Sequence, residues 1–365
     1  MTFVVDAKRA ELVLDAILDR YRRGAYPYNL RKSMLDGFEF PKRLKRGGEA
    51  EARFWFFACM LMRGGIDSDT GLKAMVEMYD QTMGRSGPRP FDPRYARKMD
   101  PLLLTGLLGL KKTKEEEPTL AIPGLEKVKP PDQPDEPHRF AIDWINSAKI
   151  VYEQFDGKAL QIISQIRDYD DAVRLIRNTG KSGFPGFQYK MVSMICFFWI
   201  ETGLLQPLLY PPPIDFHFNR VAVATRMVTR TGRKKVLSVK SGELDAFQGV
   251  LREMYLDYIT LRGYSTNEVA DAVWLLSRTL CKNNPGNSSS VGEYAARATV
   301  ITPHQVDMLL NGSDQLQFER SCKRCPVRSQ CELNVPNAHY YKLGRIETSE
   351  RIDDTPVEHL FEVKD

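Results

Sequence analysis

The stretch of sequence that decides the fold is GFPGFQYKMV, at residues 183–192. Apolar residues recur at helical spacing on both sides of it, over residues 168–177 and 188–202. A Pro-Gly turn that leads into a helix leaves the first backbone amides of that helix without partners, and such amides favour a phosphate. Because Pro-Gly turns also join helices that bind nothing, this stretch alone predicts a helical hairpin and leaves phosphate binding open.

Helical spacing extends over most of the chain, which predicts an all-α fold. Ser265, followed three positions later by Glu268, forms a capping-box pattern at the start of one helix. Two segments break the pattern: residues 111–137 are rich in proline and charge, which indicates a linker or insertion, and residues 282–321 carry only a short predicted helix at 303–310. The other predicted helices are 10–23, 49–63, 69–83, 140–155, 168–177, 188–202, 217–229, 242–261 and 267–280.

The charge is unevenly distributed along the chain. The formal net charge of +5 comes from 52 basic and 47 acidic residues. Residues 115–136 and the tail at 346–365 each carry seven acids and two bases, so the other 323 residues hold 48 bases and 33 acids. A basic body with two acidic appendages favours a polyanion as partner.

Composition excludes several classes of protein. A hydrophobic fraction of 42% with 10% aromatic residues is enough for a sizeable core, so the chain is neither disordered nor fibrous. The longest apolar runs are about ten residues, half of what a bilayer requires, and the first twenty residues are unlike a signal peptide. We therefore expect a soluble, cytoplasmic protein without a membrane partner, associated with the nucleoid if it is prokaryotic.

A second motif, PPPIDFHFNRV, occupies residues 211–221. Three prolines extend the chain, and Asp215 directly precedes a stretch of helical spacing, which predicts a helix N-cap. A capping carboxylate has fixed oxygens that point out of the helix end. It can therefore also serve as a catalytic carboxylate, and both roles stay open for Asp215.

Cysteine spacing separates two kinds of cysteine. Cys59 and Cys196 lie inside apolar runs, which predicts inert core residues. Three of the others follow the pattern Cys-x2-Cys-x5-Cys, a compact arrangement that can bring three thiolates round one metal centre. The four cysteines of the predicted metal site are Cys281, Cys322, Cys325 and Cys331.

The hairpin, the Asp215 motif and the cysteines, in this order, resemble the endonuclease III-like superfamily of helix-hairpin-helix (HhH-GPD) DNA glycosylases. The family hairpin, Leu-Pro-Gly-hydrophobic-Gly-x-Lys-x-Ala, matches at Pro185, Gly186 and Lys190. The family stretch Val-Asp-Thr-His-x-x-Arg-Val matches at Asp215, His217, Arg220 and Val221. Two features depart from the family: Gln188 replaces the second hairpin glycine, and 40 residues rather than six follow Cys281.

The resemblance implies two helical lobes with the active site in the cleft between them. Residues 49–205 would form the six-helix-barrel lobe that contains the hairpin, with an insertion near 84–157. Residues 1–48 and 206–335 would form the iron-sulfur cluster lobe, with an insertion at 282–321 and an acidic tail at 346–365. The four cysteines of the metal site would hold a 4Fe-4S cluster, with zinc as the alternative.

The implied activity is base excision repair on double-stranded DNA by a monomeric DNA N-glycosylase that flips out a damaged or mispaired base. Asp215 would stabilise positive charge at the sugar C1′, and Lys190 would attack C1′ and give an associated AP-lyase activity. The alternatives are a monofunctional glycosylase, a catalytically inactive DNA-binding relative and, less favoured, an iron-sulfur nuclease. The residues expected at the DNA are Pro185, Gly186, Phe187, Gln188, Arg63, Lys323 and Arg324.

Overall fold

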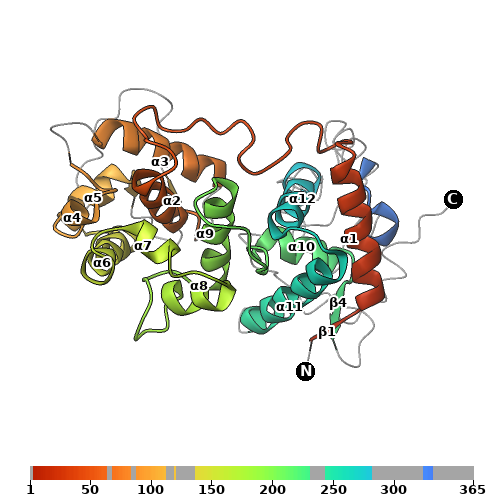
Figure 1. Ribbon diagram of the computed structural model, residues 1–365. Coiled ribbons are helices and arrows are strands. Elements are labelled where there is room, and N and C mark those ends of the chain that lie inside the picture. Colours follow the sequence, from red (N-terminus) through yellow and green to blue (C-terminus); the bar gives the residue numbers. More distant parts are fainter. Residues whose placement is uncertain are drawn as a thin grey trace, which may run out of the picture. The chain divides into compact units, whose positions relative to one another are not determined.

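The computed structural model describes residues 3–63, 68–83, 88–111, 119–120, 136–230, 243–281 and 324–331. This part of the chain is mostly helical, and none of its helices is long and apolar enough to cross a membrane. The chain divides into two compact units (Figure 1). We call Phe38–Pro213 the hairpin unit, and Met1–Gly37 with Ile214–Asp365 the cysteine unit.

The hairpin unit is built around two helices, α2 and α9, which pack against each other. Both are apolar almost all round and are buried along most of their length. Trp55 of α2 stacks on Phe198 of α9 with ring centroids 4.4 Å apart, and Phe57 stacks on Trp144 at 4.6 Å. The helices of this unit are α2 (Glu49–Leu61), α3 (Ser68–Thr82), α4 (Pro93–Ala96), α5 (Pro101–Leu107), α6 (Arg139–Gln154), α7 (Ala159–Ile163), α8 (Tyr169–Ile176) and α9 (Tyr189–Glu201).

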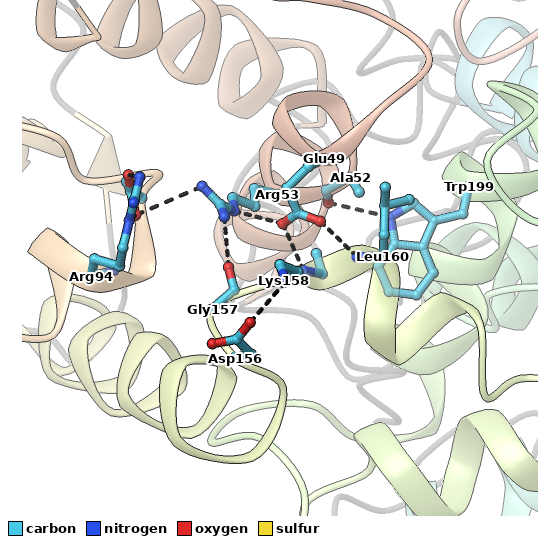
Figure 2. Close-up of polar contacts among 11 residues, drawn as sticks. Glu49, Ala52, Arg53, Arg94, Asp156, Gly157, Lys158, Leu160 and Trp199 are labelled. Carbon is cyan, nitrogen blue, oxygen red and sulfur yellow. Dashed lines mark hydrogen bonds and ion pairs between the residues drawn. The ribbon is translucent and has the colours of Figure 1, made fainter.

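A polar network fixes the N-terminal end of α2 to the turn that leads into α7 (Figure 2). The Glu49 carboxylate accepts from the backbone amides of Ala159 at 2.7 Å and Leu160 at 3.0 Å. It also pairs with the Arg53 guanidinium, which donates to the carbonyl of Gly157 at 2.7 Å. One carboxylate therefore caps a helix from a distant part of the chain.

The described residues of the cysteine unit form four α-helices, a two-stranded sheet and a short 3₁₀ turn. Helix α12 packs against both α10 and α1, and strands β1 and β4 pair antiparallel with Phe3 opposite Arg230. Ser265 caps α12 by accepting from the Glu268 amide at 3.1 Å, as the capping-box pattern predicts. The elements are β1 (Phe3–Val5), α1 (Ala7–Arg22), α10 (Phe216–Ala224), β4 (Val228–Arg230), α11 (Leu244–Arg262), α12 (Thr266–Thr279) and the 3₁₀ turn Arg328–Gln330.

The mostly helical fold agrees with the sequence-based prediction, and every predicted helix that falls on described residues is present. The helix predicted at 217–229 is wrong at its C-terminal end. Helix α10 stops at Ala224, Arg226 adopts a left-handed φ of 54°, and the chain reverses into β4 to pair with β1. The predicted helix at 303–310, Cys322, Lys323 and the acidic tail lie outside the described residues.

Several short elements in the described part of the chain were not predicted from the sequence. Among them are the helices α4, α5 and α7 and the paired strands β2 (Leu110–Lys111) and β3 (Thr119–Leu120). Strand β3 and the second residue of β2, Lys111, fall within residues 111–137, the segment that the sequence indicates as a linker. Helices α4 and α5 each begin with an Asp-Pro pair in which the aspartate caps the first turn, at Asp92 and Asp100. This pair is a recognisable start signal, because aspartate caps the free amides and proline is suited to the first helical position.

Candidate functional site: the hairpin and the Asp215 helix start

The predicted hairpin joins α8 to α9 through a tight turn at Phe184–Phe187. The Phe187 amide donates to the Phe184 carbonyl at 3.1 Å, with Pro185 second and Gly186, at φ +79°, third in the turn. This arrangement is typical of a type II turn, whose third residue needs a positive φ. The Asn178 amide donates to the Phe187 carbonyl at 2.7 Å and closes the base of the hairpin.

Two phenylalanines anchor the hairpin in the core. Phe184 and Phe187 are buried, and both rings pack against Phe56 of α2, at centroid distances of 4.8 Å and 5.2 Å. Phe187 was expected at the DNA, and its side chain instead points into the unit. Only the backbone of Phe187 is therefore suited to meet a phosphate.

Arg63 lies directly beneath the turn. Its Nη2 pairs with the Asp143 carboxylate of α6, and its guanidinium carbon lies 4.3 Å from the centroid of the Phe140 ring. A β-carbon on Gly186 would overlap this guanidinium. The Arg63 side chain is only 14% exposed, and its burial lowers the pKa of Arg63 against the opposing effect of Asp143. Arg63 therefore supports the hairpin from inside, whatever further contact it makes.

Lys190 lies in the first turn of α9 and is half-buried. Its Nζ donates to the carbonyl of Met62 at 3.0 Å, and Met62 is the C-cap of α2. The C-terminal end of a helix carries partial negative charge and favours a cation. This contact therefore ties the start of α9 to the end of α2.

Gln188, the departure from the family hairpin, is the N-cap residue of α9. Its backbone is extended, with φ −101° and ψ −179°, so this position does not require a glycine. The exposed side chain donates to the Asn178 carbonyl at 3.3 Å and does not cap α9. The substitution therefore adds a side chain beside the helix start without straining the backbone.

In the cysteine unit, Asp215 is the N-cap of α10, as its position in the sequence predicts. Its Oδ1 accepts from the His217 amide at 2.8 Å and, more weakly, from the Phe218 amide at 3.5 Å. Asp215 is 8% exposed, and its other carboxylate oxygen makes no hydrogen bond to the described residues. One oxygen is therefore fixed by the helix, and the other is uncommitted within this part of the chain.

The side chains that follow Asp215 are mostly buried in the cysteine unit. His217 Nδ1 lies 3.0 Å from the Ser277 hydroxyl of α12, and the Arg220 guanidinium lies 5.6 Å from the centroid of the Phe216 ring. Phe218 meets the edge of Tyr255 of α11 at a centroid distance of 5.3 Å. The first turn of α10 is thus packed between α11 and α12.

Three of the four predicted metal ligands fall on described residues. Cys281 follows Leu280, the C-cap of α12, and burial raises the pKa of its thiol while the nearby Arg220 lowers it. Burial first, and then the charges of Cys325 and Cys281, raise the pKa of Tyr28. Within the described ranges no three His, Cys, Asp or Glu side chains form a metal-binding group. The fourth predicted ligand, Cys322, lies outside these ranges. The three described thiols are half-buried, and thiolates are ligands of both iron-sulfur clusters and zinc.

The cysteine segment Arg324–Cys331 is held by α1. Arg9 donates through Nη2 to the Gln330 carbonyl at 2.8 Å and through Nε to the Thr225 carbonyl. Arg324, a predicted DNA contact, is exposed, and its guanidinium lies 5.4 Å from the centroid of the Tyr26 ring. Sequence reasoning missed Arg9, and no local pattern marks it, because its partners lie more than 200 positions away.

The two core cysteines behave as predicted. Cys59 and Cys196 are fully buried in α2 and α9. Burial raises the pKa of Cys196 to about 12 and that of Cys59 well above its usual range. Both thiols therefore stay protonated and unreactive.

No family model, no curated protein and no solved structure matches this chain.

Proposed function

We propose that the protein is a DNA glycosylase of base excision repair, which extrudes a damaged or mispaired base from double-stranded DNA and cleaves its glycosidic bond. The observation that carries this proposal is the turn at Phe184–Phe187, anchored on Phe56 and leading into a helix that has no side-chain cap. Such a helix start offers backbone amides and a positive dipole end to one phosphate. A contact of this kind holds DNA without selecting a sequence.

In the proposed reaction, Asp215 is the catalytic carboxylate. Positive charge develops at the sugar C1′ as the bond to the base lengthens, and a preorganised carboxylate stabilises that charge. The His217 and Phe218 amides hold one Asp215 oxygen, which leaves the second for the sugar or for an attacking water. Its low exposure strengthens the electrostatic effect, since little water screens the charge.

Two candidate reactions differ in the nucleophile that attacks the sugar. In a bifunctional enzyme, Lys190 attacks C1′, the base leaves, and the resulting Schiff base leads to strand cleavage by β-elimination. In a monofunctional enzyme, water attacks and Lys190 serves only to hold the hairpin. The contact between Lys190 Nζ and the Met62 carbonyl favours the second candidate, because a nucleophilic lysine must first leave that carbonyl.

The cysteine segment is proposed to carry a 4Fe-4S cluster, with zinc as the alternative. Cys281, Cys322, Cys325 and Cys331 would hold it, and the group would supply structural support to the segment that Arg9 ties to α1. Exposed Arg324 then lies on a surface suited to DNA phosphates.

The proposal is tested by base release and borohydride trapping on duplexes that carry an oxidised pyrimidine, uracil, a mismatch or an abasic site. A glycosylase releases the base from at least one duplex. A bifunctional enzyme also gives a covalent adduct that disappears in Lys190→Ala and persists in Lys158→Ala, which removes an exposed lysine paired with Asp156. Base release without an adduct identifies the monofunctional enzyme. Binding without base release on any duplex would identify the inactive relative and overturn the proposed activity.

A further inference from the structure

Tyr255 of α11 is fully buried, and its hydroxyl has no hydrogen-bond partner among the described residues. A buried hydroxyl without a partner costs about 1–3 kcal/mol and is rare in native proteins. Tyr258, one turn later on the same helix, donates to the Asp15 carboxylate at 2.8 Å. The Tyr258 hydroxyl thus has an acceptor, whereas the acceptor of the Tyr255 hydroxyl has to be identified.

Tyr255 packs against the helix turn that Asp215 caps. Its ring meets Phe218 edge-on at 5.3 Å, and the Phe218 amide is one of the two that point at Asp215 Oδ1. Burial raises the pKa of Tyr255 well above its usual range, and the negative charge of Asp215 adds to the shift. The phenol therefore stays protonated and can act as a donor.

The other ionisable groups at this end of α10 come from two helices. His217 and Arg220 belong to α10 itself, with the His217 ring beside Ser277 and the Arg220 guanidinium over Phe216. Cys281 follows α12 and is near Arg220. From α11, Tyr255 is the group that interacts with Asp215, whereas Tyr258 faces Asp15 of α1.

We propose that Tyr255 is a positioning residue for Asp215, and that its hydroxyl donates through one bridging water to the carboxylate oxygen that the α10 amides leave uncommitted. The catalytic consequence rests on the proposed function, whereas the contact itself does not. A donor to this oxygen orients it and stabilises the ionised carboxylate. The proposed contact thus gives the second Asp215 oxygen a donor and gives the buried Tyr255 hydroxyl an acceptor.

The catalytic test compares Tyr255→Phe with Tyr258→Phe, each of which removes one oxygen from α11. In Tyr255→Phe we expect the acid limb of the pH profile of base release to move to higher pH by about one unit, because the Asp215 carboxylate loses a donor. Tyr258→Phe should keep the wild-type profile and melt at a lower temperature, because it loses its bond to Asp15. Superimposable profiles for Tyr255→Phe and the wild type, or equal shifts in both variants, would overturn the proposal.

A second test does not depend on catalysis. The full chain labelled with ¹³C at tyrosine Cζ gives a Tyr255 resonance that is identified by its loss in Tyr255→Phe. We expect this resonance to inflect at acid pH, and to lose the inflection in Asp215→Asn but not in Asp6→Asn, which alters the N-cap of α1 in the same unit. A Tyr255 resonance that Asp215→Asn leaves unchanged would refute the contact. An inflection that responds to Asp215→Asn supports it even if no duplex loses a base.

Discussion

The guanidinium of Arg63 fills the space beneath Gly186 in which a β-carbon would lie. Arg63 is held there by Asp143 and by the Phe140 ring, so the hairpin turn rests on a charged group that lies just past the end of α2 and is fixed by α6. A turn supported in this way keeps the start of α9 in one orientation. That rigidity is what a phosphate site built from backbone amides requires.

Gly186→Ala should damage the hairpin more than a positive φ alone explains. At φ +79° an alanine is strained by about 1 kcal/mol, and here its β-carbon also overlaps Arg63. The control is Gly180→Ala in the same loop, at φ +81° with open space around it. Urea denaturation should show a loss of about 1 kcal/mol for Gly180→Ala and clearly more for Gly186→Ala. Equal losses would mean that Arg63 moves aside at no cost.

Asp143→Asn should destabilise the hairpin unit by about 2 kcal/mol, because it removes the charged partner of a largely buried guanidinium. The matched change is Arg139→Ala, since Arg139 also approaches Asp143, at 3.9 Å, but is 84% exposed. An exposed pair of this kind contributes between zero and about 1 kcal/mol. A chemical-denaturation series that gives the two variants the same loss would contradict the supporting role of Arg63.

His138 should make the hairpin unit sensitive to mild acid. Burial, and then the charge of Arg63, lower the pKa of His138 below its usual 6.5. As pH falls below 6.5 the unfolded chain takes up the proton first, so the free energy of unfolding falls until the folded histidine also titrates. Protonation also removes the Nδ1 acceptor that caps α6 through the Phe140 amide, a cap that contributes about 1 kcal/mol.

The comparison for this pH dependence is His138→Asn, which keeps a capping side chain but does not titrate. Urea denaturation at pH 7.5 and pH 5.5 should show a smaller drop in stability for His138→Asn than for the wild type. If both proteins lose the same amount, the acid sensitivity belongs to other groups.

Features of this structure that depend on residues close together in the sequence could be predicted, and features that depend on residues far apart could not. The long helices follow from apolar spacing, and the Asp215 and Ser265 caps follow from side chains within three positions of the amides they bind. The end of α10 was missed because Arg226 takes a left-handed φ without being a glycine. Helices of four to seven residues span too few turns to show periodicity.

The same distinction applies to the candidate site. The Pro185-Gly186 turn and the Asp215 cap are local features, and the sequence predicts both. The contacts that support them are not, because Arg63 and Asp143 are 80 positions apart and their pairing depends on how α2 packs against α6. Tyr255 was overlooked for the same reason, since an aromatic residue within a helix first predicts a core position.

The metal centre has a spectroscopic test. A 4Fe-4S cluster should give an absorption band in the visible region that is lost in Cys325→Ser, whereas Cys196→Ser, which alters a buried core thiol, should retain it. Metal analysis of the purified protein separates the alternatives: zinc without the band would replace the cluster, and neither metal would refute a shared centre.

The most direct test of the account is single-turnover base release by Asp215→Asn on the duplex that the wild type processes. Asparagine keeps the cap of α10 but removes the negative charge, so we expect the rate to fall by at least about 100-fold while DNA binding and the melting temperature stay close to those of the wild type. Asp6→Asn, the same change at the cap of α1, should retain the wild-type rate. A rate for Asp215→Asn equal to that of Asp6→Asn would contradict the claim that Asp215 is the catalytic carboxylate of a DNA glycosylase.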